Sequence, residues 1–168
     1  RKGNVQILKD LGANLGFGVT TLELIKGDHG ELSSTSIRHL LSDGKPKEAA
    51  IQLGHWHRIE GPIIGGEQRG RILGYPTANM ELHELHLPKL GVYAVLIDIL
   101  EGLYKGRYKG VASIGVGQMF GKNRLNLETY IFDFSGDIYG VQVSIGIVEY
   151  LRHELSFDIV DILVKQME

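Results

Sequence analysis

The first part of the chain has apolar residues at the spacing expected for one face of a helix. Apolar residues recur at intervals of three and four within residues 1–18, which places them on one side of a helix: Val5, Leu8, Leu11 and Leu15. The apolar run at 19–25 is short and predicts a strand. We therefore expect a helix followed by a strand at the start of the chain.

Two more helices are predicted in the first third of the chain. The first, at 34–42, begins where Ser33 or Ser34 can cap the free backbone N–H groups. The second, at 46–53, has Pro46 in its first turn, where the helix needs no N–H. Together with the segments before them, these helices predict an α/β remnant that is too short to form a complete nucleotide-binding sheet.

From Arg58 onward, short alternating runs separated by glycine predict antiparallel strands. The clearest runs are at 91–98, 108–116, 127–134 and 139–148. Ser135, Gly136 and Asp137 predict a hairpin turn between the last two of them. A final amphipathic helix is predicted after its cap at Ser156, with this apolar stripe: Phe157, Val160, Leu163, Val164 and Met167.

The composition of the chain excludes some classes of function but does not identify a single one. The 168 residues are 43% hydrophobic and 23% charged, which is normal for a soluble globular protein. The formal net charge of -2 gives no general reason to expect nucleic-acid or membrane binding. The chain has no cysteine, which excludes disulfides and thiolate metal sites and fits a cytoplasmic protein. Because it begins with Arg1 and no apolar leader, we expect it to start inside a longer protein.

Thr77 and Asn79 are candidate metal ligands. They lie two residues apart on a segment expected to be extended, so their side chains face the same way. A hydroxyl and an amide oxygen suit magnesium, which also takes phosphate oxygens. Pro76 fixes the backbone at the entry to this segment. From chemistry alone, a turn and strand whose polar side chains bond the local backbone is an equally good interpretation.

Glu128 is a candidate proton acceptor. In the strand predicted at 127–134 it shares a face with Tyr130, Phe132 and Phe134. A carboxylate at the end of an aromatic face can accept a proton from a substrate hydroxyl. The alternative is a strand-end glutamate that reaches water, which is the commoner situation for a single glutamate.

The loop at 65–71 is a candidate phosphate-binding segment. Its glycines let backbone N–H groups approach an anion, and its arginines add charge that suits phosphate. Loops of glycine and arginine are common as solvated turns, so from this loop alone a solvated turn is the better interpretation.

Seven sequence strings, in the same order along the chain, resemble the bacterial bifunctional riboflavin kinase/FMN adenylyltransferase family, often called FAD synthetases. The strings are Arg58–Pro62, Arg69–Asn79, Gly91–Val95, Gly110–Gly115, Glu128–Phe134, Asp137–Gly140 and Leu151–Glu154. The resemblance implies a complete riboflavin kinase domain at 58–168, folded as a six-stranded antiparallel Greek-key barrel with a C-terminal helix. It also implies that ATP and magnesium are used to phosphorylate riboflavin to FMN.

The same resemblance implies roles for the candidate residues. Thr77 and Asn79 would hold magnesium and nucleotide phosphate, and Glu128 would be the general base for the ribityl hydroxyl. Arg152 and Glu154 would lie beside the flavin. Further contacts to the phosphates would come from Gly70, Arg71, Gly74 and Pro76.

Residues 1–57 resemble the end of the adenylyltransferase domain, an incomplete nucleotidyltransferase (Rossmann-like) remnant. Ser34, Thr35 and Arg38 match the late nucleotide-binding motif of that domain. A capped helix start explains Ser34 equally well. The early His-x-x-His-type phosphate motif is absent from the sequence, so we expect the longer parent protein, but not this chain, to convert FMN to FAD.

One departure from the family pattern lies after the predicted strand at 108–116. Gly117, Gln118 and Met119 stand where the family usually has Arg-Pro-Thr, in a predicted glycine-rich connection at 117–123. We expect weaker or altered substrate binding as a result. The alternative function is a catalytically weak flavin- or nucleotide-binding regulatory module.

Two other kinds of site are not favoured by the sequence. The histidines at 55, 57, 83 and 86 lack the His-Glu-x-x-His spacing that places two zinc ligands on one helical face. The helices predicted at 34–42 and 46–53 could form a helix-turn-helix, but they lack the basic face that DNA binding needs.

Overall fold

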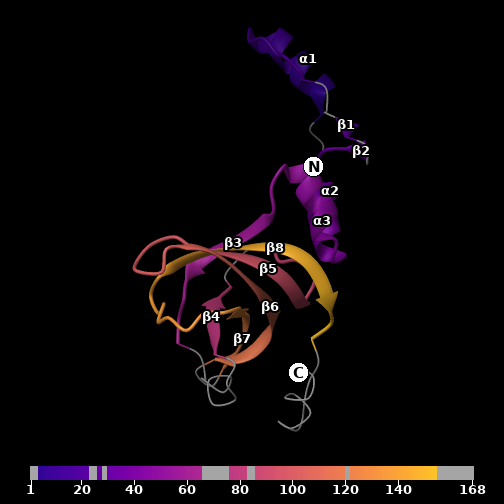
Figure 1. Ribbon diagram of the computed structural model, residues 1–168. Coiled ribbons are helices and arrows are strands. Elements are labelled where there is room, and N and C mark those ends of the chain that lie inside the picture. The colour runs from indigo at the N-terminus through magenta and orange to yellow at the C-terminus, as the bar shows by residue number, and fades with distance from the viewer. Residues whose placement is uncertain are drawn as a thin grey trace. The chain divides into compact units, whose positions relative to one another are not determined.

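The computed structural model describes residues 4–22, 26–27, 30–65, 76–82, 86–119 and 122–154 (Figure 1). Contacts between backbone positions separate the chain into two compact units that divide between Ser33 and Ser34. The final helix predicted after Ser156 lies outside the described residues. No helix in the described part of the chain has the length and apolar character needed to cross a membrane.

The described residues of the first unit form α1 (Val5–Leu15) and the short antiparallel strands β1 (Lys26–Gly27) and β2 (Gly30–Glu31). The predicted first helix is confirmed, and the side-chain oxygen of Asn4 caps it by accepting the Ile7 N–H at 2.9 Å. The predicted strand is wrong at 19–22, which has no regular secondary structure. The chain turns back directly after α1, because the Phe17 N–H donates to the Gly12 carbonyl at 3.0 Å.

The second unit begins with the helices α2 (Ser34–Ser42) and α3 (Pro46–Leu53), and both helix predictions are confirmed. These helices pack on the strands that follow. The Lys89 N–H donates to the Leu41 carbonyl at 2.9 Å, and Lys47 forms an ion pair with Glu149. The compact unit that contains the sheet therefore includes these two helices.

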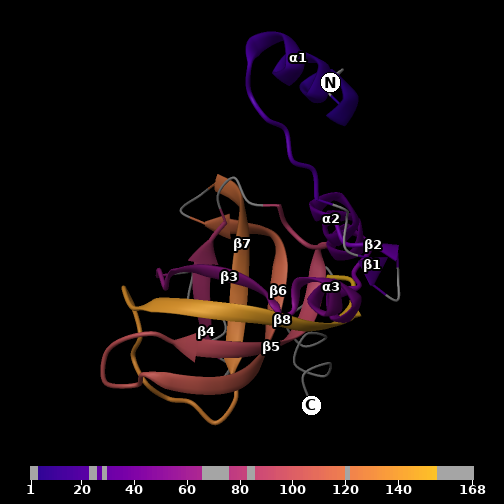
Figure 2. The same ribbon diagram turned by 90° about the horizontal axis from the view of Figure 1, so that it is seen from above.

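The second unit is mainly β. Its strands are β3 (His57–Pro62), β4 (Thr77–Glu81), β5 (Gly91–Ile99), β6 (Gly106–Met119), β7 (Lys122–Ile131) and β8 (Gln142–Arg152). They form one antiparallel sheet in the order β3-β8-β5-β6-β7-β4, which curls into a half-barrel (Figures 1 and 2). The segment after β3 meets the edge strand β4 at one bridge, where the Ile64 N–H donates to the Asn79 carbonyl at 2.8 Å.

The inner face of the curled sheet forms the hydrophobic core. Strand β5 shows the two-residue period that produces this core, because every second side chain from Tyr93 to Ile99 is buried. The other strands add these buried residues: Ile59, Met80, Ala112, Ile114, Leu127, Ile131, Val143, Ile145 and Ile147. Side chains at the alternate positions lie on the outer face and are available for other interactions.

The predicted hairpin between 127–134 and 139–148 is wrong. Strand β7 ends at Ile131 and pairs with β6 and β4, whereas β8 pairs with β3 and β5. The connection at 132–141 crosses between them because Ile138 is buried in the core and the Gly140 N–H donates to the Ile63 carbonyl at 2.7 Å. These contacts draw the chain away from β7.

The predicted glycine-rich connection at 117–123 is also wrong, because most of it is paired strand. Gly117 pairs with Arg124, and Met119 pairs with Lys122, so β6 and β7 continue as a two-stranded ribbon. Glycine lowers strand propensity, but a strand that already has a neighbour in register can extend through it.

The hydroxyl of Thr129 leads to a prediction about stability. Thr129 is fully buried on the core face of β7, and its Oγ1 has no hydrogen-bond partner among the described residues. The substitution Thr129→Val keeps the shape of the side chain and removes a desolvated polar atom. We therefore expect the free energy of unfolding to rise by about 1 kcal/mol. Urea unfolding measures this change. Thr129→Ser, which keeps the hydroxyl and removes the methyl group, should instead be destabilised.

His57 leads to a prediction about pH. Burial lowers the pKa of His57 below its ordinary value of 6.5, and the neighbouring His86 and His55 lower it further. The unfolded chain therefore binds this proton more readily than the folded chain, so stability is full above pH 6.5 and declines as the pH falls below it. Melting temperatures from about pH 8 to about pH 5 should show this decline, and His57→Gln should show a smaller one. Identical pH dependence in both proteins would contradict the assignment.

Candidate active site

The register of three neighbouring strands gathers the predicted metal ligands and base on one face of the sheet. Asn79 on β4 lies directly opposite Glu128 on β7, and Glu128 lies opposite Ser113 on β6. Directly paired residues share a face, and so do residues two apart on one strand. Thr77 therefore lies on this face beside Asn79, opposite Tyr130. We call this surface of β4, β7 and β6 the site face.

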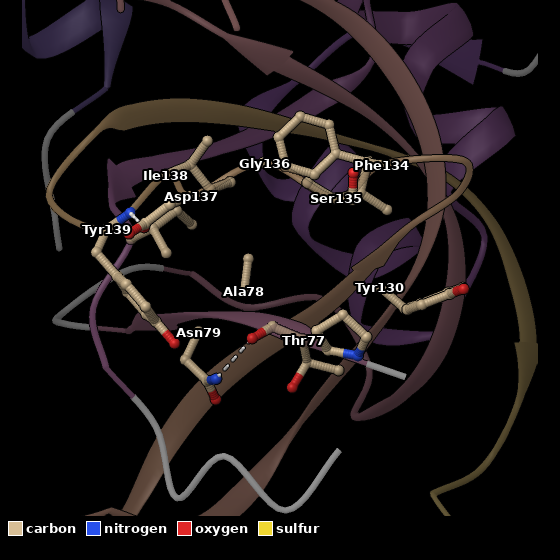
Figure 3. Close-up of a pocket in the computed structure, with 13 residues that line it drawn as sticks. Thr77, Ala78, Asn79, Tyr130, Phe134, Ser135, Gly136, Asp137, Ile138 and Tyr139 are labelled. Atoms are coloured by element: carbon tan, nitrogen blue, oxygen red, sulfur yellow. Dashed lines mark hydrogen bonds between the residues drawn. The ribbon is translucent and has the colours of Figure 1, made fainter. Parts of the chain in front are cut away.

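Asn79 presents its side chain at the edge of the site face. It is 7% exposed, and its Nδ2 donates to the Thr77 carbonyl at 3.3 Å, as Figure 3 shows. This bond uses the amide nitrogen and not the amide oxygen. One amide oxygen and one threonine hydroxyl form a small set of oxygen ligands. Such a set fits magnesium, which completes its coordination with water and phosphate.

Glu128 is held by a residue that the sequence did not single out. The side chain of Glu128 is half-buried, and its Oε1 accepts a hydrogen bond from Asn126 Nδ2 at 2.9 Å. Asn126 is itself only 3% exposed. Its spacing of two residues from Glu128 was a usable signal, because it places both side chains on the same face of the strand.

Glu154 reaches the site face from the end of β8. Its Oε1 accepts a hydrogen bond from Ser113 Oγ at 3.2 Å. It also lies directly against Gly115, where a side chain of any size would meet the carboxylate. Arg152 is exposed, and its guanidinium donates to the His153 carbonyl at 3.1 Å. The structure thus brings Glu154, but not the Arg152 guanidinium, into hydrogen-bond contact with the site face.

The carboxylate on β5 forms ion pairs, whereas the described contacts of the carboxylates on the site face are with neutral side chains. On β5, Asp98 contacts both Arg58 and Arg107 at 2.6 Å. The hydrogen bond from Arg107 is the largest of the effects that hold the pKa of Asp98 below its usual range. On the site face, the described partners of Glu128 and Glu154 are the neutral side chains of Asn126 and Ser113. The described contacts of these two carboxylates therefore include no ion pair, in contrast to those of Asp98.

A pocket of about 440 Å³ opens beside Thr77 and Asn79, the predicted metal ligands. Its lining combines the start of β4, the end of β7 and the connection at 132–141, and includes Ile63, Pro76, Thr77, Ala78, Asn79, Tyr130, Ile131 and residues 134–139. Figure 3 shows Thr77 and Asn79 on one side of this space and the 134–139 segment across from them. Asp137, Ile138 and Tyr139 belong to one of the strings that resemble the family, but the expected hairpin turn did not predict that they line a pocket.

The remaining predicted site residues lie in the loop at 65–71, in the segment after it and in α2. Gly70, Arg71 and Gly74 lie outside the described residues. In α2, Arg38 Nη2 donates to Ser34 Oγ at 3.3 Å, while Thr35 is exposed. These three α2 residues are therefore placed on one helix, and their predicted contact with nucleotide stays a prediction.

Comparison with known proteins identifies the family. The family model described as "Flavokinase: Riboflavin kinase" matches residues 53–168. The chain belongs to the riboflavin kinase family. This match contains β3 to β8 and with them the whole site face.

Relatives of this riboflavin kinase family member are bifunctional. A riboflavin kinase/FMN adenylyltransferase from Listeria monocytogenes is 38% identical over 155 residues, which is 90% of this chain and 48% of the relative. The one from Escherichia coli K12 is 33% identical over 167 residues, 99% of this chain and 52% of the relative. The chain thus spans about half the length of the curated relatives it matches.

A solved structure supports the fold. A protein from Streptococcus pneumoniae, described as a macrolide-efflux protein, matches with a TM-score of 0.77 and 36% identity. The match covers 95% of this chain and 51% of that one.

Proposed function

We propose that the chain transfers the γ-phosphate of ATP to the ribityl 5'-hydroxyl of riboflavin, giving FMN and ADP, with magnesium as cofactor. The observation that carries this proposal is the register that sets Asn79 opposite Glu128 with Thr77 two residues away. Phosphoryl transfer depends mainly on positioning and charge neutralisation. A pair of metal ligands beside a carboxylate supplies both.

The pocket at Thr77 is proposed as the nucleotide site. Its apolar wall, with Ile63, Phe134 and Ile138, suits the flat face of adenine, and its Thr77–Asn79 side suits the phosphates. Magnesium, when bound by Thr77 and Asn79, would neutralise the phosphate oxygens. Gly70, Arg71 and Gly74 are proposed to complete the phosphate contacts.

Glu128 is proposed as the general base. Its Oε1 is held by Asn126, so Oε2 can accept the proton of the ribityl hydroxyl. As that proton moves, the ribityl oxygen bonds to the γ-phosphorus and the bond to the β,γ-bridging oxygen breaks, which releases ADP. The flavin would lie on the β6 side of the site face, toward Glu154 and Arg152.

The proposal extends to the longer protein. Residues 1–57, with Ser34, Thr35 and Arg38, are proposed as the end of an FMN adenylyltransferase domain, and 58–168 as a Greek-key riboflavin kinase domain with a C-terminal helix. The bifunctional relatives support this arrangement because each is about twice as long as the matched region. The parent protein would then make FAD from FMN. The cysteine-free composition supports a cytoplasmic location.

Product analysis tests the activity. Riboflavin, ATP and magnesium are incubated with the chain, and FMN and FAD are separated by chromatography. We expect FMN without FAD. Glu128→Gln should lower turnover by about 10²-fold or more while Mg·ADP binding is kept. If the wild-type chain binds ligands but forms no FMN, the regulatory-module alternative replaces the kinase proposal, and any FAD would contradict the assignment of residues 1–57.

Asn126 gives a separate prediction about the base. Asn126→Ala removes the donor that holds Glu128, so we expect kcat to fall roughly tenfold with little change in the KM for ATP. Steady-state kinetics measure both constants. In the Glu128→Gln background the same substitution should have almost no further effect, because the two residues act together. Equal losses in both backgrounds would show that Asn126 acts independently of Glu128.

A further inference from the structure

The wall of the pocket that faces Thr77 is supported from outside the pocket by aromatic rings. Phe134 lines the pocket, and its ring is contacted by two tyrosines of the β5–β6 hairpin. The ring of Tyr104 lies 5.3 Å from that of Phe134 at 79°, and the ring of Tyr108 lies 5.1 Å from it at 75°. Both are edge-to-face contacts, a favourable geometry for aromatic pairs. Neither tyrosine lines the pocket itself.

The hairpin holds the two tyrosines in a defined arrangement. Tyr108 lies on β6, and its hydroxyl donates to the Tyr104 carbonyl at 3.0 Å. The turn that carries Tyr104 is closed by the Lys105 N–H, which donates to the Gly102 carbonyl at 3.3 Å. Tyr104 is therefore anchored through its backbone, and its ring is left to contact the pocket wall.

Gly136 shows how closely the wall rests on these rings. A Cβ at Gly136 would lie 2.7 Å from both the Phe134 ring and the Tyr104 ring. Real Cβ atoms do not approach other atoms so closely, so the backbone of the wall lies directly on the two rings. Gly136 also lines the pocket. A shift of the Tyr104 ring would thus move atoms that line the pocket.

The rest of the connection at 132–141 is fixed at its two ends. The Phe132 N–H donates to the Lys109 carbonyl at 2.9 Å, and Ile138 is buried in the core. Between these points, Phe134 is the side chain that ties the segment to the hairpin. The position of the wall at 134–136 therefore depends on the aromatic contacts.

We propose that Tyr104 is a positioning residue for the nucleotide pocket. Its ring fixes Phe134 and Gly136 so that the wall is shaped before the nucleotide arrives, which reduces the ordering that binding would otherwise require. Loss of the ring weakens nucleotide binding and leaves phosphoryl transfer from the bound nucleotide unchanged, because Tyr104 touches none of the proposed ligands or the base. This inference rests on the proposed function.

Kinetics of three variants in the same turn test the inference. Tyr104→Ala should raise the KM for ATP roughly fivefold, with kcat at saturating ATP and the KM for riboflavin unchanged. Tyr104→Phe keeps the ring and should restore the wild-type KM. Leu103→Ala is the matched control, because Leu103 is adjacent and 88% exposed. An unchanged KM in Tyr104→Ala, a matching fall in kcat, or a failure of Tyr104→Phe to restore the KM would overturn the proposal.

Calorimetry with Mg·ADP separates this inference from the proposed function. If the wild-type chain forms no FMN, the kinase proposal is contradicted. The effect of Tyr104→Ala can still be measured in that case, by comparing the Kd for Mg·ADP of the variant with that of the wild type. We expect that Kd to rise by the same factor as the KM. If Tyr104→Ala does not fold, Gly136→Ala tests the same contact from the other side by pushing the two rings apart. It should also weaken Mg·ADP binding, and wild-type affinity in Gly136→Ala would count against the proposal.

Discussion

The site depends on the register of β7 between its two neighbours. Leu127, Thr129 and Ile131 point into the core, which commits Glu128 and Tyr130 to the opposite face. A shift of one residue would bury the carboxylate and expose the leucine, so the core itself excludes the alternative. The apolar packing that stabilises the sheet thereby also aims the proposed base at the proposed metal ligands.

The pocket arises from the way the chain leaves β7. A tight hairpin after β7 would have placed the next strand at its side, where β4 now lies. Instead, the connection crosses to β3 and β8, held by the burial of Ile138 and the hydrogen bond between Gly140 and Ile63. The space enclosed between this connection and β4 is the pocket. An irregular segment thus forms one wall of the pocket, while regular strands carry the proposed metal ligands and the proposed base.

Precision at the site comes from neighbouring side chains as well as from strands. Asn126 orients Glu128, Ser113 contacts Glu154, and the tyrosines of the β5–β6 hairpin hold Phe134. Each of these contacts costs little to form, because the backbone that carries it is already ordered by the sheet. The proposed kinase chemistry therefore draws on two layers: residues that would touch the substrates, and residues that fix those residues.

Local pattern was enough to predict much of this protein. The helices at Ser34–Ser42 and Pro46–Leu53, the strand at Gly91–Ile99 and the shared face of Thr77 and Asn79 follow from periodicity within a few residues. The ordered motifs were enough to indicate the family, and the family match confirmed it. Which strand lies beside which was decided only by the tertiary structure. The positions of β7 and β8 depend on burying side chains that are distant in sequence in one shared core. The alternation of apolar and polar residues within a strand does not specify which other strand will pair with it. For the same reason the contact between Phe134 and Tyr104 emerged only from the folded chain, where strands and loops far apart in sequence meet.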